Sequence, residues 1–348
     1  MAAAAASVLA LSACSSSGTA GASDESNQVT IETSGAYITY APLFVAEAKG
    51  YFKDQKLEAT IQLLSNPSTA MSALLNNGAQ FALVAAVQNW QSDLSGRPVT
   101  IIGSNDGQNT LTLVVSNKAY ERASIDPGMP IKDRLARLKG MSFGVRGLTS
   151  QDGSTLKSML GYAGLTTDDV KLVTLTNSSA LVTSLDQGII DGFVSGAPFP
   201  QQAISSGKAK EVANLTAGEF PPFAGATTTV YSAAPAYVKS NPAQTQAFMN
   251  AIAMAQRYIS LHPKEAAALM HGTKNFESYP LALLEDQLTL MTKTGALPDN
   301  PVSTVEAFEK ARPLLDAAIG KPADIDFSTT FTSDFATKAA QYANGRVS

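Results

Sequence analysis

The sequence predicts an α/β protein of two lobes, each built around its own sheet. The chain has 348 residues, of which 45% are apolar and 16% charged, so it is long enough and apolar enough for two domain-sized cores. From Val29 onward, short β-rich runs alternate with helical patterns, which favours βα units and mostly parallel sheets. This alternation starts again mid-chain and then gives way to an almost wholly helical region.

The first set of elements includes the stretch YAPLFVAEAKGYFKDQKLEATI, from Tyr40 to Ile61. Pro42 near the first helical position and Gly50 beyond the last turn predict a helix, and a strand follows from Leu57. We predict strands at 29–33, 59–64, 81–85 and 99–103, and helices at 42–49, 68–76 and 88–94. The apolar run 110–116, TLTLVVS, is predicted to be the first crossing between the lobes.

The second set repeats this pattern. We predict strands at 142–145, 170–175, 192–195 and 211–215, and helices at 131–138, 151–163, 178–186 and 199–206. Residues 227–232 are the predicted return strand, and helices follow at 235–239, 242–260, 263–270, 280–292, 303–319 and 333–342. These assignments give a lobe 1 made of residues 28–113 plus 227–348 and a lobe 2 made of residues 114–226.

The N-terminus is similar to a lipoprotein signal. Its apolar run, 2–11, is shorter than the ~20 residues that span a bilayer but fits a signal-peptide core. The run ends in LSAC, which resembles a lipobox, so residues 1–14 are interpreted as the signal and Cys14 as the lipidated residue. Cys14 is the only cysteine, which excludes a disulfide framework; the alternative is a buried cysteine in an ordinary helix. Residues 15–27, SSSGTAGASDESN, are predicted to be a flexible tether.

Charge and motifs exclude several function classes. The formal net charge is −4 and no run of Lys or Arg occurs, so nucleic acid is not a predicted partner. The sequence contains no HExxH and no P-loop, and its two histidines, His262 and His271, fall in the helical C-terminal region. No metal site and no cofactor are therefore predicted.

A strand ending at SGAYITY, a helix, a Gly-Tyr-Phe stop and a second strand resemble the opening of the extracytoplasmic solute-binding proteins of ABC transporters. The closest resemblance is to binders of aliphatic sulfonates, taurine, nitrate and thiamine precursors, and it covers nearly everything from Val29 onward. It implies a type II periplasmic-binding-protein fold, with a ligand cleft between the lobes and a helical tail that returns to lobe 1. It also implies a monomer, lipid-anchored outside the cell membrane through Cys14, that delivers a small molecule to a membrane permease and its ATPase and does no chemistry on it.

In this fold the ligand lies at the carboxyl ends of parallel strands. Two post-strand loops of lobe 1 are therefore candidates. Tyrosines in the first can stack on a ligand or pack at the lobe surface. In the second loop, small residues permit close approach of a ligand. The lone tryptophan there either lines the ligand site or belongs to the core. The candidate residues are Ser34, Ala36, Tyr37, Tyr40, Ala86, Gln88 and Trp90.

Lobe 2 contributes two further loops. A glycine and hydroxyl loop at a helix N-terminus suits an anion, worth about 0.3–1 kcal/mol per charge, and Arg146 can add a bidentate contact to a sulfonate or carboxylate. The alternative is that Thr149 or Ser150 only caps the helix while Arg146 is solvated. Many relatives carry an acidic residue where Ala197 stands, which here favours an anionic or neutral ligand. The candidates are Arg146, Gly147, Thr149, Ser150, Ser195, Ala197 and Pro198, with Tyr231 beside the return crossing.

Lobe closure is expected about hinges at 113–116 and 226–230.

Two rival functions remain. The thiamine-pyrimidine synthases of fungi share the implied fold, but their chemistry needs a cofactor lysine and a histidine- and cysteine-rich iron site, which this chain lacks. A sensory or adhesion lipoprotein would use the same clamp to present its ligand to a receptor.

Overall fold

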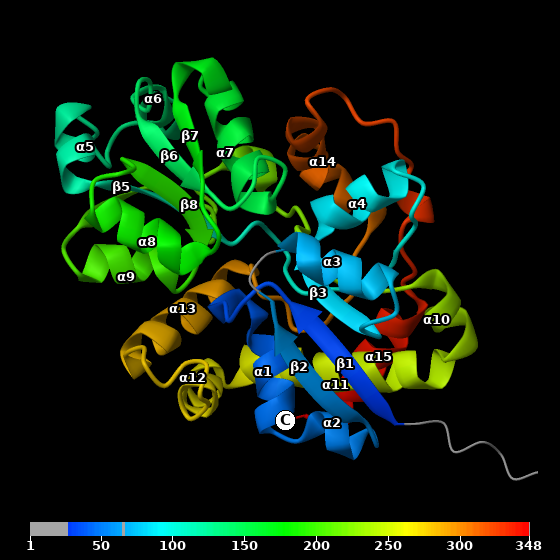
Figure 1. The fold of residues 1–348 in the computed structure, drawn as a ribbon. Helices are drawn as coiled ribbons and strands as arrows, with labels where there is room; N and C mark the ends of the chain where they lie inside the picture. The colour runs from blue at the N-terminus through cyan, green and yellow to red at the C-terminus, as the bar shows by residue number, and fades with distance from the viewer. Residues whose placement is uncertain (1–26, 65–66, 348) are drawn as a thin grey trace, which may run out of the picture.

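The computed structural model describes residues 27–64 and 67–347, so the predicted signal, Cys14 and nearly all of the tether lie outside the described residues. Each lobe contains a five-stranded sheet (Figure 1). Lobe 1 has the strand order β2-β1-β3-β10-β4 and lobe 2 the order β7-β6-β8-β5-β9. The strands are β1 (Gln28–Thr33), β2 (Glu58–Leu63), β3 (Phe81–Ala85), β4 (Thr100–Ser104), β5 (Leu111–Ser116), β6 (Ser142–Val145), β7 (Lys171–Thr174), β8 (Gly192–Gly196), β9 (Ala209–Asn214) and β10 (Thr229–Ala233).

Both sheets are mixed. β1 pairs in parallel with β2 and β3, and β6 with β7 and β8. The strand that follows each crossing is inserted antiparallel: β10 between β3 and β4, and β5 between β8 and β9. The sheets are therefore less uniformly parallel than predicted.

The first crossing is residues 105–110, and the prediction that placed it at 110–116 is wrong. β5 pairs along its whole length within the sheet of lobe 2, so a lobe boundary after residue 113 falls inside this strand. The physical reason is burial: the run from Leu111 to Val115 is fully covered, and a continuous apolar run is typical of a central strand with both faces covered. The crossing itself is polar, with sequence NDGQNT.

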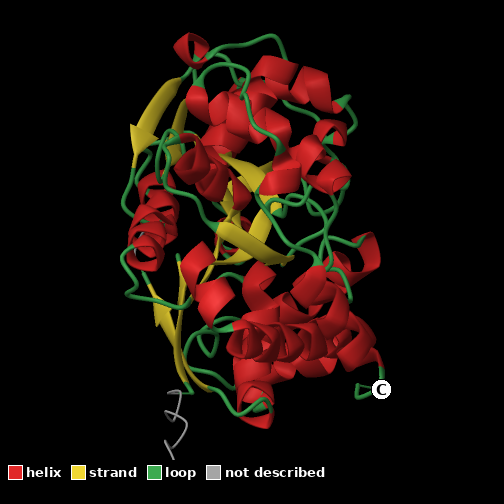
Figure 2. Ribbon diagram, turned by 90° about the vertical axis from the view of Figure 1, so that its right-hand side faces the viewer, coloured by secondary structure: helices red, strands yellow, loops and turns green. Residues whose placement is uncertain are grey.

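Helices cover both faces of the strands (Figure 2). They are α1 (Ala41–Ala48), α2 (Tyr51–Asp54), α3 (Pro67–Leu75), α4 (Ala86–Leu94), α5 (Asn117–Arg122), α6 (Ile131–Ala136), α7 (Gln151–Tyr162), α8 (Ser178–Asp186), α9 (Phe199–Ser205), α10 (Pro235–Ser240), α11 (Pro242–Leu261), α12 (Pro263–His271), α13 (Leu281–Thr294), α14 (Val305–Ile319) and α15 (Asp334–Asn344). The sequence did not predict α2 or α5. Gly50, at φ 75°, ends α1 as predicted, but the chain then turns directly into α2.

The helical C-terminal region returns to lobe 1, where α11 packs against α1 and α15. α14 instead packs against both α4 of lobe 1 and α7 of lobe 2 (Figure 1). One apolar cluster consequently joins Trp90 of α4, Leu156 of α7 and Phe308 of α14. The lobes are thus joined by side-chain packing as well as by the two chain crossings. Within the described ranges, no helix combines the length and apolar character needed to cross a membrane.

Candidate functional site

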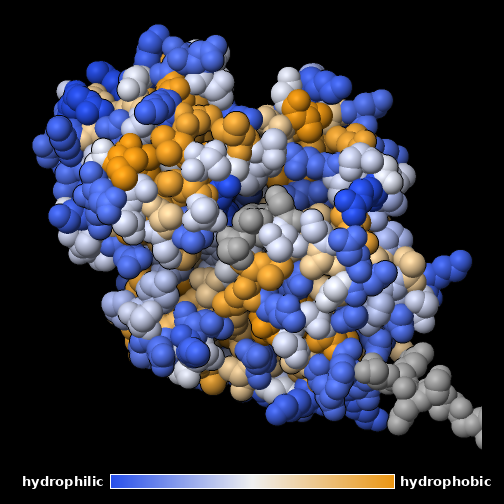
Figure 3. Space-filling model, in the orientation of Figure 1, coloured by the Kyte–Doolittle hydropathy of each residue, from blue (hydrophilic) through white to orange (hydrophobic). Residues whose placement is uncertain are grey.

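The carboxyl ends of the parallel strands in the two lobes face each other (Figure 1), and the molecular surface is hollowed between the lobes (Figure 3). The loop after β1 reaches across to lobe 2, where the backbone N–H of Ile38 donates to the carbonyl of Ala197 at 2.9 Å. Gln91 of α4 donates to the carbonyl of Thr149 at 3.4 Å. The structure therefore brings together loops that lie far apart in the sequence.

Tyr37 lies where these loops of the two lobes come together. Arg146 Nη1 donates to the Tyr37 hydroxyl at 2.6 Å, and the same hydroxyl shares a hydrogen bond with Ser178 Oγ at 2.8 Å. The ring packs edge-on against Tyr40 and Phe199, with centroids 5.2 and 5.6 Å away. Among the described residues, a cavity of about 10 Å³ lies beside Tyr37, roughly the room for one water molecule. The two lobes therefore contact each other directly at Tyr37.

Arg146 is buried and paired, so the alternative in which it is solvated does not hold. Its side chain is 6% exposed, and Nη2 lies 3.2 Å from Oδ1 of Asp152, which is 0% exposed. Asp152 also accepts from the Arg146 backbone N–H at 2.7 Å and from Ser150 Oγ at 2.7 Å. Burial by itself would lower the pKa of Arg146, but the Asp152 carboxylate, together with Tyr37 and Tyr40, outweighs it and the pKa is raised. The guanidinium is therefore charged and held in place, with Nε lacking a protein partner.

Most of the other predicted residues near Tyr37 make contacts that stabilise the fold. Ser150 caps α7, accepting from the backbone N–H of Gly153, and Gly147 precedes this cap. Ser195 is buried, with Oγ 3.2 Å from Ser178 Oγ. Burial raises the pKa of Tyr40 to about 12, although a hydrogen bond with Ser34 opposes the rise. Ala36, Ala86, Thr149 and Pro198 also belong to the converging loops, and the carbonyl of Thr149 accepts the hydrogen bond from Gln91.

Two predicted ligand-binding residues lie in the core instead. Trp90 is fully buried, its ring 4.6 Å from that of Phe327 and 5.7 Å from that of Phe308. Tyr231 is fully buried, donates to Asn105 Oδ1 at 2.7 Å and packs against Phe248. Trp90 points inward because its side of α4 is covered by Phe308 of α14 and by Phe327, contacts that local sequence does not reveal.

Sequence reasoning missed Ser178 and Asp152. Ser178 begins the helix after β7, so the rule that nominated the other post-strand loops would have found it had it been applied to that strand. Asp152, one residue into α7, resembles an ordinary acidic residue of a first helical turn. Nothing in the sequence indicates that it is fully buried and paired with Arg146.

A family model described as NMT1/THI5 like matches residues 38–266. The chain belongs to the NMT1/THI5-like family. Its relatives include the putative binding protein YtlA of Bacillus subtilis, 23% identical over 309 residues that cover 86% of each chain. Another is the 4-amino-5-hydroxymethyl-2-methylpyrimidine phosphate synthase of Candida albicans, 26% identical over 235 residues that cover 66% of each chain.

Solved structures confirm the predicted fold for this NMT1/THI5-like chain. The periplasmic nitrate-binding protein NrtA of Synechocystis aligns with a TM-score of 0.75 and 14% identity, covering 91% of this chain and 89% of that one. The alkanesulfonate-binding protein SsuA of Xanthomonas axonopodis, bound to MOPS, aligns with a TM-score of 0.68 and 16% identity, covering 88% and 98%. The chain therefore has the type II periplasmic-binding-protein fold, with two lobes and a helical C-terminal region.

In this NMT1/THI5-like fold, the fully buried Asp106 links the two chain crossings between the lobes. Its Oδ1 accepts from the backbone N–H groups of Thr228 and Thr229 at 2.7 and 3.0 Å, and its Oδ2 from the Thr228 hydroxyl at 2.8 Å. Thr228 Oγ1 also accepts from Gln151 Nε2, at 3.0 Å, at the start of α7. One carboxyl group thus links the first crossing, the return crossing and lobe 2.

Stability should depend on pH through Asp106. Burial raises its pKa to about 7, although hydrogen bonds from Thr228 and Thr229 oppose the rise, whereas an unfolded aspartate ionises near pH ~3.9. Between these values the native state holds a proton that the unfolded chain has lost. The free energy of unfolding should therefore fall as pH rises from about 4 to 7, by at most about 1.4 kcal/mol per pH unit.

Urea unfolding at several pH values measures this slope. Asp106→Asn should flatten it, while Asp133→Asn at an exposed position should leave it unchanged. Equal slopes in the wild type and Asp106→Asn would show that Asp106 does not carry the dependence.

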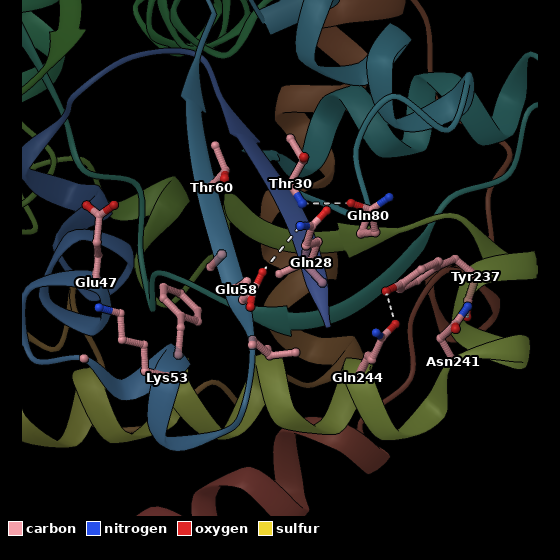
Figure 4. A pocket seen from close by; sticks show the side chains of 15 residues that line it. Gln28, Thr30, Glu47, Lys53, Glu58, Thr60, Gln80, Tyr237, Asn241 and Gln244 are labelled. Atoms are coloured by element: carbon pink, nitrogen blue, oxygen red, sulfur yellow. Dashed lines mark hydrogen bonds between the residues drawn. The ribbon is translucent and has the colours of Figure 1, made fainter. Parts of the chain in front are cut away.

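A larger hollow, of about 900 Å³, lies at the amino ends of β1 and β2, opposite to the converging loops (Figure 4). Several of its polar side chains bond to one another or to the backbone: Gln28 to Glu58 at 3.4 Å, Gln80 to the N–H of Thr30 at 2.7 Å, and Tyr237 to Gln244 at 2.7 Å. Neither lobe 2 nor a crossing contributes to it. Because only lobe 1 lines this hollow, a ligand there would not contact both lobes, as lobe closure requires.

Proposed function

We propose that this chain is the extracytoplasmic solute-binding component of an ABC importer. It would capture a small anionic or neutral organic solute, such as a sulfonate, a carboxylate or a pyrimidine-like molecule, and deliver it to a membrane permease driven by its ATPase. The observation that carries the proposal is the contact of Tyr37 with Arg146 and Ser178. It joins the lobes where the post-strand loops converge, and the nitrate-binding and alkanesulfonate-binding proteins have the same fold.

Closure would bend the chain at residues 105–110 and in the return segment before β10. A solute contacting both lobes favours the closed state by its differential affinity. To enter, it must displace the Tyr37 hydroxyl from Arg146, or bind beside it at the free Nε of Arg146. A solute with an acceptor oxygen would replace the interaction that the phenol makes.

A synthase is the second candidate, because a relative carries that name. The side chains that meet between the lobes are an arginine, a tyrosine and serines, and the charged group among them is already paired with Asp152. His262 and His271 lie at the two ends of α12, a helix packed against α1 and α13. We therefore favour binding without chemistry.

The proposal includes lipid attachment at Cys14, residues 15–27 as the tether and action as a monomer. A diacylated cysteine supplies the two chains that stable anchoring needs. A sensory lipoprotein would share all of these features. Permease and ATPase genes beside this one would favour transport, and their absence would favour sensing.

A thermal-shift panel of ethanesulfonate, taurine, propionate, nitrate and an aminopyrimidine tests the binding function. A ligand at a hundredfold excess over its dissociation constant adds about 2.7 kcal/mol to the free energy of unfolding, so a true ligand should raise the melting temperature clearly. If none of them does, the proposed ligand class is wrong.

Calorimetry on Arg146 variants tests the site. Arg146→Ala should weaken an anionic ligand by about 1.5–3 kcal/mol, and Arg146→Lys, which keeps the charge but loses the planar fork, should weaken it less. Arg137→Ala, at an exposed position of lobe 2, is the control. Wild-type affinity in both Arg146 variants would remove Arg146 from the site.

A further inference from the structure

Gln88 presents a buried acceptor to the space between the lobes. It lies in the first turn of α4 and is 9% exposed, and its Oε1 has no hydrogen-bond partner. Gln91, three residues later, donates to the carbonyl of Thr149 in the loop that carries Arg146. Residues at i and i+3 share a helix face, so Gln88 lies on the face of α4 that is directed at lobe 2.

Glu32 presents a second acceptor on the same side of the sheet. It is the last but one residue of β1 and is 3% exposed, and its Oε2 has no hydrogen-bond partner. In register it lies beside Ala82 of β3, whose side chain packs with α3, and α3 contacts α4. Glu32 and Gln88 therefore lie on the face of the sheet that α3 and α4 cover, at the carboxyl ends of β1 and β3.

The two acceptors differ from the polar groups of lobe 2. Arg146 and Ser178 offer N–H and O–H donors, which suit the acceptor oxygens of a solute. Glu32 takes part in none of the ion pairs of the described residues, and burial raises its pKa. A buried acceptor without a donor is costly, and a carboxylate is best satisfied by a charged N–H donor.

We propose that Glu32 and Gln88 select solutes that carry an amino or ammonium nitrogen at the end facing lobe 1. The acceptor end of the same solute would face Arg146 and Ser178. This inference rests on the proposed solute-binding function. It narrows the ligand class from any small anionic or neutral solute to one with acceptors at one end and N–H donors at the other.

Matched pairs of probes that differ in one amino group test the selection. Taurine and ethanesulfonate form one pair, and β-alanine and propionate the other. Isothermal calorimetry on the wild-type protein should give an affinity at least about tenfold higher for the amino member of a pair, as a charge-assisted hydrogen bond predicts. Glu32→Gln should reduce that ratio about tenfold and leave the affinity for the des-amino member unchanged.

Two further variants complete the experiment. Gln88→Met removes the amide acceptor at similar size, and it should lower the ratio without altering the affinity for the des-amino member. Glu121→Gln, at a side chain that is 71% exposed, should change nothing. Circular dichroism and urea unfolding confirm that each variant is folded.

The outcomes separate the two proposals. Equal wild-type affinity for both members of each pair would overturn the role of Glu32 and Gln88 while leaving solute binding intact. An unchanged ratio in Glu32→Gln and Gln88→Met would also overturn it. If no member of either pair binds, the selection proposed here is wrong, and the broader thermal-shift panel decides whether solute binding fails with it.

Discussion

Replacing Asp152 with alanine is expected to lower the free energy of unfolding by about 3–5 kcal/mol, because it leaves the buried Arg146 guanidinium without its counter-charge. Asp152 is 0% exposed and Arg146 is 6% exposed, and their closest charged atoms lie 3.2 Å apart. Asp152 also accepts the backbone N–H of Arg146 and the hydroxyl of Ser150, so these donors lose their partner as well. Urea unfolding at pH 7 measures the loss.

A double-mutant cycle separates the charge from the packing. Combining Asp152→Ala with Arg146→Met removes the stranded charge, so the double variant should regain much of the stability that Asp152→Ala loses. Glu306→Ala breaks an exposed pair with Lys310, whose side chains are 77% and 45% exposed, and should cost less than about 1 kcal/mol. A loss from Asp152→Ala no larger than this control would mean that the pair contributes little to folding.

The positions of most helices and strands were predictable because they depend on local signals. Gly50, at positive φ, ends α1 as its sequence indicates, and the predicted strand 142–145 coincides with β6. The first crossing was not predictable by the same means. An apolar run such as Leu111 to Val115 fits either a buried strand or a crossing, and only its pairing with β8 and β9 decides.

The candidate site was predictable at the level of loops but not of partners. The rule that ligands lie beyond the carboxyl ends of parallel strands nominated Tyr37 and Arg146, which are 109 residues apart yet hydrogen-bonded. It did not find Asp152, whose partner is set by the fold of the loop, nor the burial of Trp90. Which side of α4 is covered depends on α14, more than two hundred residues later in the chain.

Trp90→Ala should therefore destabilise the protein by about 3–5 kcal/mol, the usual cost of removing a large aromatic side chain from a core. The indole lies between Phe308 of α14 and Phe327, and it belongs to the apolar cluster that continues into lobe 2. Removing it leaves a cavity where the N-terminal and C-terminal parts of the chain meet. Urea unfolding measures the loss, and calorimetry with any solute found in the panel measures binding by the folded variant.

Trp90→Phe distinguishes packing from ligand contact. The indole Nε1 has no hydrogen-bond partner, so phenylalanine loses no polar interaction and should cost much less than alanine. If Trp90 is purely a core residue, both variants should bind solute with nearly wild-type affinity under conditions where they are folded, since the side chain is fully buried. Lower affinity in both variants together with unchanged stability would instead make Trp90 a wall of the ligand site.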